Sequence, residues 1–181
     1  MIGLKTDMVE LLPYTPEWSE EFQKEKQLLF ELLSDFSIIV EHVGSTSLIG
    51  CPAKPVIDVF VGVESLDIAE KMIPILTSNG YINKFNVPNE VYFKKTANGL
   101  TTHHIHIADV HGEVWDSQIL FRDYLNSHPD KLHEYIELKT RLALMHPNER
   151  DLYSAGKKDF IENCIYEAKN EFIRKRIKEE Y

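Results

Sequence analysis

Cysteine is scarce in this sequence, and its scarcity excludes two classes of small protein. Cys51 and Cys164 are the only 2 cysteines among 181 residues, and neither lies in a CxxC or a Cys/His zinc spacing. The chain is therefore neither a disulfide scaffold nor a cysteine-based zinc module, and its thiols suit a reducing compartment. We expect both cysteines to be free thiols with no catalytic role.

Long apolar runs are also missing. No stretch approaches the roughly 18 apolar residues of a membrane-spanning helix, and the N-terminus has no basic segment followed by an apolar one. The content of 43% hydrophobic and 27% charged residues is ordinary for a globular protein and argues against disorder. These observations predict a cytoplasmic protein that does not associate with membranes.

Basic residues are too few for a general nucleic-acid binder. The chain has 20 Lys and Arg against 29 Asp and Glu, a formal net charge of −9. Because binding a DNA or RNA polymer draws heavily on Lys and Arg to neutralise phosphates, we do not expect a nucleic-acid polymer as the partner. The basic segment 174–178 lies among acidic residues and is typical of a solvated helix face. A small phosphorylated ligand is compatible with this balance, and no feature of the sequence indicates an oligomeric state.

The spacing of apolar residues predicts an α+β protein, with residues 1–181 forming a single domain. Its first part, about 14–110, is a mixed β-sheet with flanking helices, and its second part, about 111–181, is helical. The expected helices are 16–36, 66–79, 114–127, 129–145 and about 149–179, and the expected strands are 38–43, 56–63, 81–85, 91–95 and 102–108.

Proline, asparagine and glycine mark boundaries within this pattern. Pro74 lies inside the predicted helix 66–79 and should kink or split it. Asn98–Gly99 is a strong hairpin signal, and residues 86–89 form another predicted turn of the sheet. We expect the two apolar strands, 38–43 and 56–63, to be neighbours in one sheet.

A small, hydroxyl-rich loop follows the first predicted strand. Gly44 lets the backbone come close to a ligand, while Ser45, Thr46 and nearby amides can donate hydrogen bonds to phosphate oxygens. The chain contains neither a P-loop nor a Gly-x-Gly-x-x-Gly motif, so neither standard mononucleotide motif applies. An ordinary turn is the alternative interpretation.

Asp58 lies in the middle of the apolar strand 56–63. A carboxylate in such a strand is costly unless it is paired or binds a metal. Asp58 is therefore either a functional residue or one half of a salt bridge, with Lys54 or with an arginine of the helical part as the partner.

Two histidines share one face of the last predicted strand. His104 and His106 lie two positions apart, and side chains alternate between the faces of a strand. At a separation of about 7 Å, two imidazoles can share a metal or bracket a phosphate. Structural histidines with satisfied hydrogen bonds are the alternative.

Two basic residues of the helical part can reach an anionic ligand. Arg122 can bind phosphate bidentately, and Lys157 can act as a point charge. The alternative is that both form surface ion pairs, with Asp123 and Asp159 respectively.

Taken together and in order, these segments resemble the GrpB family. The likeness begins at Tyr14–Trp18, ends at Phe160–Ile161, and therefore covers nearly the whole chain. It is carried by residues 41–47 (EHVGSTS), 53–58 (AKPVID), 104–106 (HIH) and 120–125 (LFRDYL) with His128–Pro129. The resemblance implies the fold of the nucleotidyltransferase superfamily, and it suggests a link to dephospho-CoA kinase, to which the family is fused in some proteins.

The superfamily pattern also implies a site. It consists of a Gly-Ser turn, two acidic residues separated by one residue, and a third carboxylate on a later strand, which together hold phosphates and two divalent ions. Gly44–Ser45 and Asp58 match this pattern, but Phe60 stands in the place of the second acid. The third carboxylate is also missing unless Asp109 serves, so a one-metal or altered site is expected.

Two functions follow as expectations. The first is metal-assisted transfer of a nucleotidyl or phosphoryl group to a small acceptor, with Mg²⁺, Mn²⁺ or Zn²⁺ as the cofactor. The alternative is a nucleotide-binding module without catalysis, acting beside a coenzyme A pathway enzyme. The predicted catalytic residues are Asp58, His104 and His106; the predicted substrate-binding residues are Gly44, Ser45, Thr46, Lys54, Arg122 and Lys157; the predicted metal ligands are Asp58, His104, His106 and Glu41. Ser45, Asp58 and the two histidines should line one cleft, with Glu41 or His42 at its edge.

Overall fold

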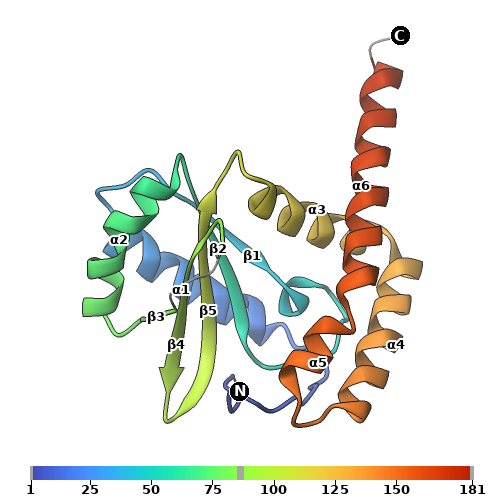
Figure 1. Ribbon diagram of the computed structural model, residues 1–181, viewed down its shortest axis with the longest axis horizontal. Helices are drawn as coiled ribbons and strands as arrows, with labels where there is room; N and C mark the ends of the chain where they lie inside the picture. The colour runs from blue at the N-terminus through green and yellow to red at the C-terminus, as the bar shows by residue number, and fades with distance from the viewer. Residues whose placement is uncertain (1, 85–87, 180–181) are drawn as a thin grey trace.

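The computed structural model describes residues 2–84 and 88–179, with side chains as far as residue 174. It confirms the α+β architecture, a mixed five-stranded sheet with helices around it and a helical section after it (Figure 1). The strands are β1 (Ile39–Val43), β2 (Ile57–Val63), β3 (Ile82–Lys84), β4 (Val91–Ala97) and β5 (Leu100–Asp109), and their order in the sheet is β1-β2-β5-β4-β3. β2 and β5 pair in parallel, whereas the other neighbouring strands pair antiparallel. The predicted neighbours β1 and β2 are indeed adjacent.

Side-chain alternation along β2 and β5 gives the sheet two different faces. On one face, Val59, Val61 and Ile105 are completely buried against α1 (Glu17–Leu32) and α2 (Leu66–Ser78). This is the main hydrophobic core, and Trp18 and Met72 fill it from the two helices. The opposite face carries the polar residues of β2 and β5, and the helical section covers it.

The helical section consists of α3 (Glu113–Ser127), α4 (Pro129–Met145), α5 (Arg150–Ala155) and α6 (Lys158–Glu179), and α6 extends away from the sheet (Figure 1). The prediction of one helical segment over 149–179 is wrong in one respect, because the chain breaks at Gly156–Lys157. At this break α5 lies close to α4, where a Cβ added to Gly156 would lie 2.6 Å from Leu142 Cδ2. The break is important for the site because it sets Lys157 between two helices.

The turns and strand ends add smaller corrections. α2 continues through Pro74 without being split. The Asn98–Gly99 hairpin is confirmed, with φ of 52° and 75°, and both of its strands reach closer to the turn than predicted. The end of the predicted strand 81–85 and the start of the predicted turn 86–89 lie outside the described residues. Before α1, Leu4 and Leu12 form isolated β-bridges that the sequence did not indicate.

Two expectations about the whole chain can be compared with the structure. Cys51 and Cys164 are free thiols, and both are buried. Within residues 2–84 and 88–179, no helix has the length and apolar character needed to cross a membrane.

Candidate functional site

A cavity of about 590 Å³ lies against the polar face of the sheet. Its walls come from the turn after β1, from β2, β4 and β5, and from α3 and α5 with the break that follows α5. Eight of the predicted site residues line it: Gly44, Ser45, Thr46, Lys54, Asp58, His104, His106 and Lys157. The sequence thus located most of the cavity, although β1, β2, β5 and the helical section are far apart along the chain.

Asp58 projects into this cavity from β2 and pairs with His104 of β5. The parallel register places the two residues side by side, and His104 Nδ1 lies 2.8 Å from Asp58 Oδ1. Burial acts to raise the pKa of Asp58, but the hydrogen bond to His104 and the nearby positive charges hold that pKa well below its usual range. Among the described residues, the salt bridge to Lys54 or to an arginine, the alternative interpretation of Asp58, is not present; the partner of Asp58 is the imidazole of His104, whose own pKa is lowered by burial. The Asp58 side chain is 31% exposed, so the carboxylate faces the cavity instead of a dry core.

The turn after β1 is shaped by its contact with Asp58. Gly44 has φ 69° and ψ −172°, a conformation that is essentially restricted to glycine. A Cβ at Gly44 would lie 2.3 Å from Asp58 Oδ2, so the backbone and the carboxylate touch here. The turn continues as the short 3₁₀ helix η1 (Ser45–Ser47), in which Ser47 Oγ donates a hydrogen bond to the Gly44 carbonyl at 2.7 Å. Gly44 is thus required both by the turn and by the approach of Asp58.

The hydroxyl groups of η1 have protein partners. Ser45 Oγ lies 3.4 Å from the Tyr135 hydroxyl, and Thr46 Oγ1 lies 2.9 Å from His42 Nε2. His42 in turn stacks on Phe22, and burial lowers its pKa to about 4. The sequence predicts Glu41 or His42 at the edge of the cavity, but His42 does not line it. Its ring packs against Phe22 of α1 and is hydrogen-bonded to Thr46.

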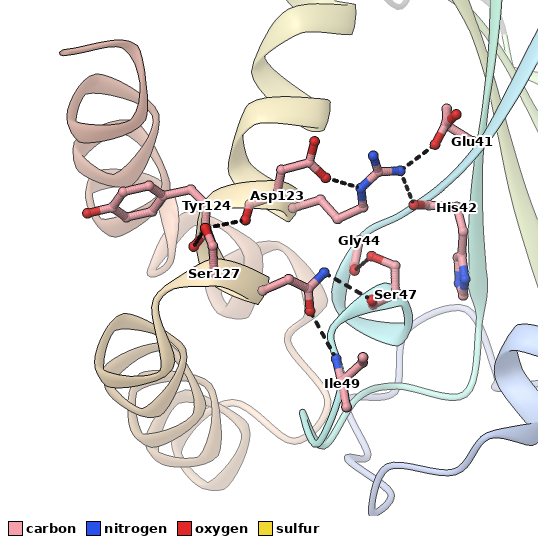
Figure 2. A network of polar contacts seen from close by, with 10 residues as sticks. Glu41, His42, Gly44, Ser47, Ile49, Asp123, Tyr124 and Ser127 are labelled. Atoms are coloured by element: carbon pink, nitrogen blue, oxygen red, sulfur yellow. Dashed lines mark hydrogen bonds and ion pairs between the residues drawn. The ribbon is translucent and has the colours of Figure 1, made fainter. Parts of the chain in front are cut away.

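Glu41 and Arg122 are the two predicted site residues that do not line the cavity. Arg122 Nη1 binds Glu41 Oε2 at 2.5 Å and the His42 carbonyl at 3.0 Å, while its Nε binds Asp123 at 2.8 Å (Figure 2). The structure thus does not place Glu41, a predicted metal ligand, or Arg122, a predicted phosphate ligand, on this cavity. Both side chains are engaged in fastening α3 to β1, and the alternative pairing of Arg122 with Asp123 is present.

His106 lies two residues after His104 on the same face of β5, and aromatic rings enclose it. Its Nδ1 lies 2.9 Å from Glu90 Oε2, and it stacks on Phe60 and on Tyr92 with ring centroids 4.7 Å away in each case. Phe60, which stands where the superfamily pattern has its second acid, therefore forms part of the cavity wall. Sequence reasoning missed Glu90; the only signal was its position two residues before Tyr92, which pairs with His106 across the strands.

The predicted metal donors do not assemble into a ligand set. In the described part of the chain, no three His, Cys, Asp or Glu side chains are placed to hold a metal ion together. Asp58 Oδ1 and the Nδ1 atoms of both histidines are engaged in hydrogen bonds, so each histidine would ligate only through Nε2, and Glu41 is held by Arg122. Asp109 does not line this cavity, and its Oδ1 accepts a hydrogen bond from the backbone of the next turn. These residues do not provide the cluster of carboxylates that a two-metal mechanism needs.

A cationic wall faces the Asp58 side of the cavity, formed by Lys54, Arg150 and Lys157. No ion pair joins any of the three to a carboxylate of the described residues, and both lysine ammonium groups lie over the ring of Tyr153, at 5.4 and 4.4 Å from its centroid. Burial and the neighbouring cations lower the pKa of Lys157 to about 7 and that of Lys54 to about 8. Arg150 was not predicted, because nothing in its local sequence distinguishes it from a surface arginine.

Comparison with known proteins gives a consistent picture. The family model described as GrpB protein matches residues 8–167. The glutamate-rich protein GrpB of Alkalihalophilus pseudofirmus is 36% identical over 173 residues, which is 92% of this chain and 99% of that protein. The crystal structure of the conserved protein GrpB from Enterococcus faecalis superposes with a TM-score of 0.81 at 31% identity, covering 90% of this chain and 99% of that one.

Two more distant similarities concern the fold and the domain context. A structure of the Cid1 poly(U) polymerase bound to MgATP gives a TM-score of 0.52 at 17% identity, over 72% of this chain and 44% of that one. This likeness shows a nucleotidyltransferase-like fold. A dephospho-CoA kinase of Mycolicibacterium paratuberculosis is 28% identical over 88% of this chain and 46% of that protein.

Proposed function

The chain belongs to the GrpB family, and from its cavity we propose that it binds a small phosphorylated molecule, a nucleotide by analogy with the fold. The observation that carries this proposal is the wall formed by Lys54, Arg150 and Lys157. These cations lie together without a carboxylate partner among the described residues, in a chain whose net charge is −9. Phosphate is the ligand that such a group favours, because it accepts several charged hydrogen bonds at once.

The lowered lysine pKa values support the same proposal. Burial and repulsion from the neighbouring cations destabilise the charged forms of Lys54 and Lys157, so a counter-charge beside them would be stabilising. A bound polyanion would remove this repulsion and would return both pKa values toward the ordinary lysine range. The Gly44–Ser45 turn lies on the same cavity and offers a close backbone approach for the ligand.

We further propose that the protein transfers a nucleotidyl or phosphoryl group from this ligand to a small acceptor. The arrangement that favours transfer is the Asp58–His104 pair, because the carboxylate orients the imidazole and favours its protonated form against the burial that lowers the pKa of His104. Asp58→Asn should then abolish turnover of the transferable nucleotide while its binding persists. Loss of binding together with turnover would assign Asp58 to ligand binding instead.

A binding module without catalysis is the second candidate, and Phe60 favours it. An aromatic ring stacked on His106 occupies the position where the superfamily pattern supplies an acid. The similarity to a dephospho-CoA kinase supports a role for such a module beside an enzyme of coenzyme A metabolism. Ligand binding without any turnover, across nucleotide triphosphates and coenzyme A precursors, would favour this candidate.

Two adjacent lysines provide a matched test of binding. Lys157 lines the cavity, whereas the neighbouring Lys158 lies outside it, near Glu162. By isothermal titration calorimetry with ATP, pyrophosphate and coenzyme A, Lys157→Met should weaken binding by about tenfold or more, since a charged hydrogen bond contributes about 1.5–3 kcal/mol. Lys158→Met should leave the affinity unchanged. Equal affinities for both variants and the wild type would contradict the proposed site.

A further inference from the structure

We infer that phosphate charge in this cavity is neutralised by Lys54, Arg150 and Lys157 in place of divalent metal ions, so that the metal-free anion is the preferred ligand. This inference rests on the proposed function, because it assumes that the cavity binds phosphate. It goes beyond that function by specifying the ionic form of the ligand.

The first argument is the state of the metal donors. The carboxylates that a hard divalent cation prefers are limited, among the described residues lining this cavity, to Asp58 and Glu90. Asp58 Oδ1 is bound to His104, and Asp58 Oδ2 lies against the backbone of Gly44. Glu90, which directly precedes β4, is bound to His106 of the neighbouring strand β5. Each carboxylate is thus engaged with its own histidine.

The second argument is the position of Phe60. In the register of the sheet, Phe60 lies beside His106 as Asp58 lies beside His104. A second carboxylate at position 60 would therefore complete a cluster with Asp58, but the side chain present is an aromatic ring that is 3% exposed and stacked on His106. An apolar ring in this place supplies no metal ligand where the pattern implied by the resemblance has a carboxylate.

The third argument is the charge already present. Metal-dependent phosphate sites use the ion to neutralise the phosphate oxygens. In this cavity the same task falls to three side-chain cations, which also repel an additional dication. A Mg²⁺ ion bound to the ligand would take up oxygens that these side chains bind and would reduce the ligand charge that attracts them. Excess Mg²⁺ should therefore weaken binding.

The experiment compares the affinity of the whole protein for ATP and for pyrophosphate in EDTA with that in excess Mg²⁺ or Mn²⁺. We expect the affinity in EDTA to exceed the affinity with either metal severalfold. Binding that is lost in EDTA, or is equal there or weaker than with a metal, would overturn the inference and leave the proposed function intact. Absence of binding under every condition would instead refute the proposed function, and the inference with it.

Two variants make the comparison sharper. Arg150→Met should weaken binding in EDTA by about tenfold or more. Arg141 is an exposed arginine of α4 and serves as the control, so Arg141→Met should leave the affinity unchanged. Phe60→Asp should make binding stronger with Mg²⁺ than without it, because it restores the second acid beside Asp58, and Phe60→Leu should not. If Phe60→Asp does not fold, Arg150→Met decides alone: unchanged affinity in EDTA would overturn the inference.

Discussion

Replacing Gly44 with alanine perturbs the cavity at the point where backbone and carboxylate touch. The φ of 69° with ψ of −172° is strained for alanine by about 1–3 kcal/mol. The added Cβ would also lie 2.3 Å from Asp58 Oδ2 and 2.9 Å from its Cγ, so Asp58 must move. Movement weakens the charged hydrogen bond to His104, which contributes about 1.5–3 kcal/mol where it is intact. Because Asp58 is partly exposed, we expect a total loss of about 3 kcal/mol in the free energy of unfolding.

Gly50 supplies the matched control for this prediction. It also has a positive φ, 81°, but nothing lies within 4 Å of its hypothetical Cβ. Gly50→Ala should therefore cost only backbone strain, about 1 kcal/mol. Urea denaturation followed by circular dichroism measures both variants, and the difference of about 2 kcal/mol corresponds to about 4–8 °C in melting temperature for a chain of this size.

A double-mutant cycle isolates the contact itself. In an Asp58→Ala background the contacts with Oδ2 and Cγ are absent and only the Cβ of residue 58, 3.0 Å from the added Cβ, remains, so Gly44→Ala should cost less than it does in the wild type. The reasoning would be refuted by a Gly44→Ala variant that is as stable as Gly50→Ala in the wild-type background. An unchanged cost in the Asp58→Ala background would show that backbone strain alone is responsible.

Three further predictions concern charge, fastening and the thiols. Affinity for pyrophosphate should fall as the pH rises from about 7 to 9. The pKa of Lys157 is lowered to about 7 and that of Lys54 to about 8, so both side chains lose their positive charge in this range. Calorimetry at constant ionic strength measures the affinity, and an affinity that does not change with pH would contradict a role for the cationic wall. Arg122→Met should lower the free energy of unfolding by about 1–2 kcal/mol, because it removes the contact between α3 and β1. The affinity for pyrophosphate should stay unchanged, and a large loss of affinity would show that Arg122 binds the ligand. Replacing Cys51 and Cys164 together with serine should preserve ligand binding in every variant that folds, and its loss in a folded protein would give a thiol a role.

The alternation of side chains made the floor of the cavity predictable from the sequence. The apolar run of β2 indicated a central strand, and period-two spacing placed Asp58 and Phe60 on one face and His104 and His106 on the matching face of β5. These are local rules, and they hold because β2 and β5 are neighbours in the sheet.

The cavity walls depend on packing that local rules do not describe. Arg150 enters the site from the first residue of α5, after the turn that follows α4, while Glu90 enters from the residue before β4. Glu41 lies outside the cavity lining although its strand position is suitable, because Arg122 from α3 binds it. The Glu41–Arg122 pairing joins residues 81 positions apart, and no periodicity in the sequence indicates it.

A crystal structure of the protein with bound ATP tests most directly whether this cavity is a phosphate site. We predict that the phosphate oxygens lie within hydrogen-bonding distance of Lys54, Arg150 and Lys157, beside the Gly44–Ser45 turn, in crystals grown without a divalent metal. Phosphates bound at another surface, with these three side chains making no contact to the ligand, would contradict the proposed site.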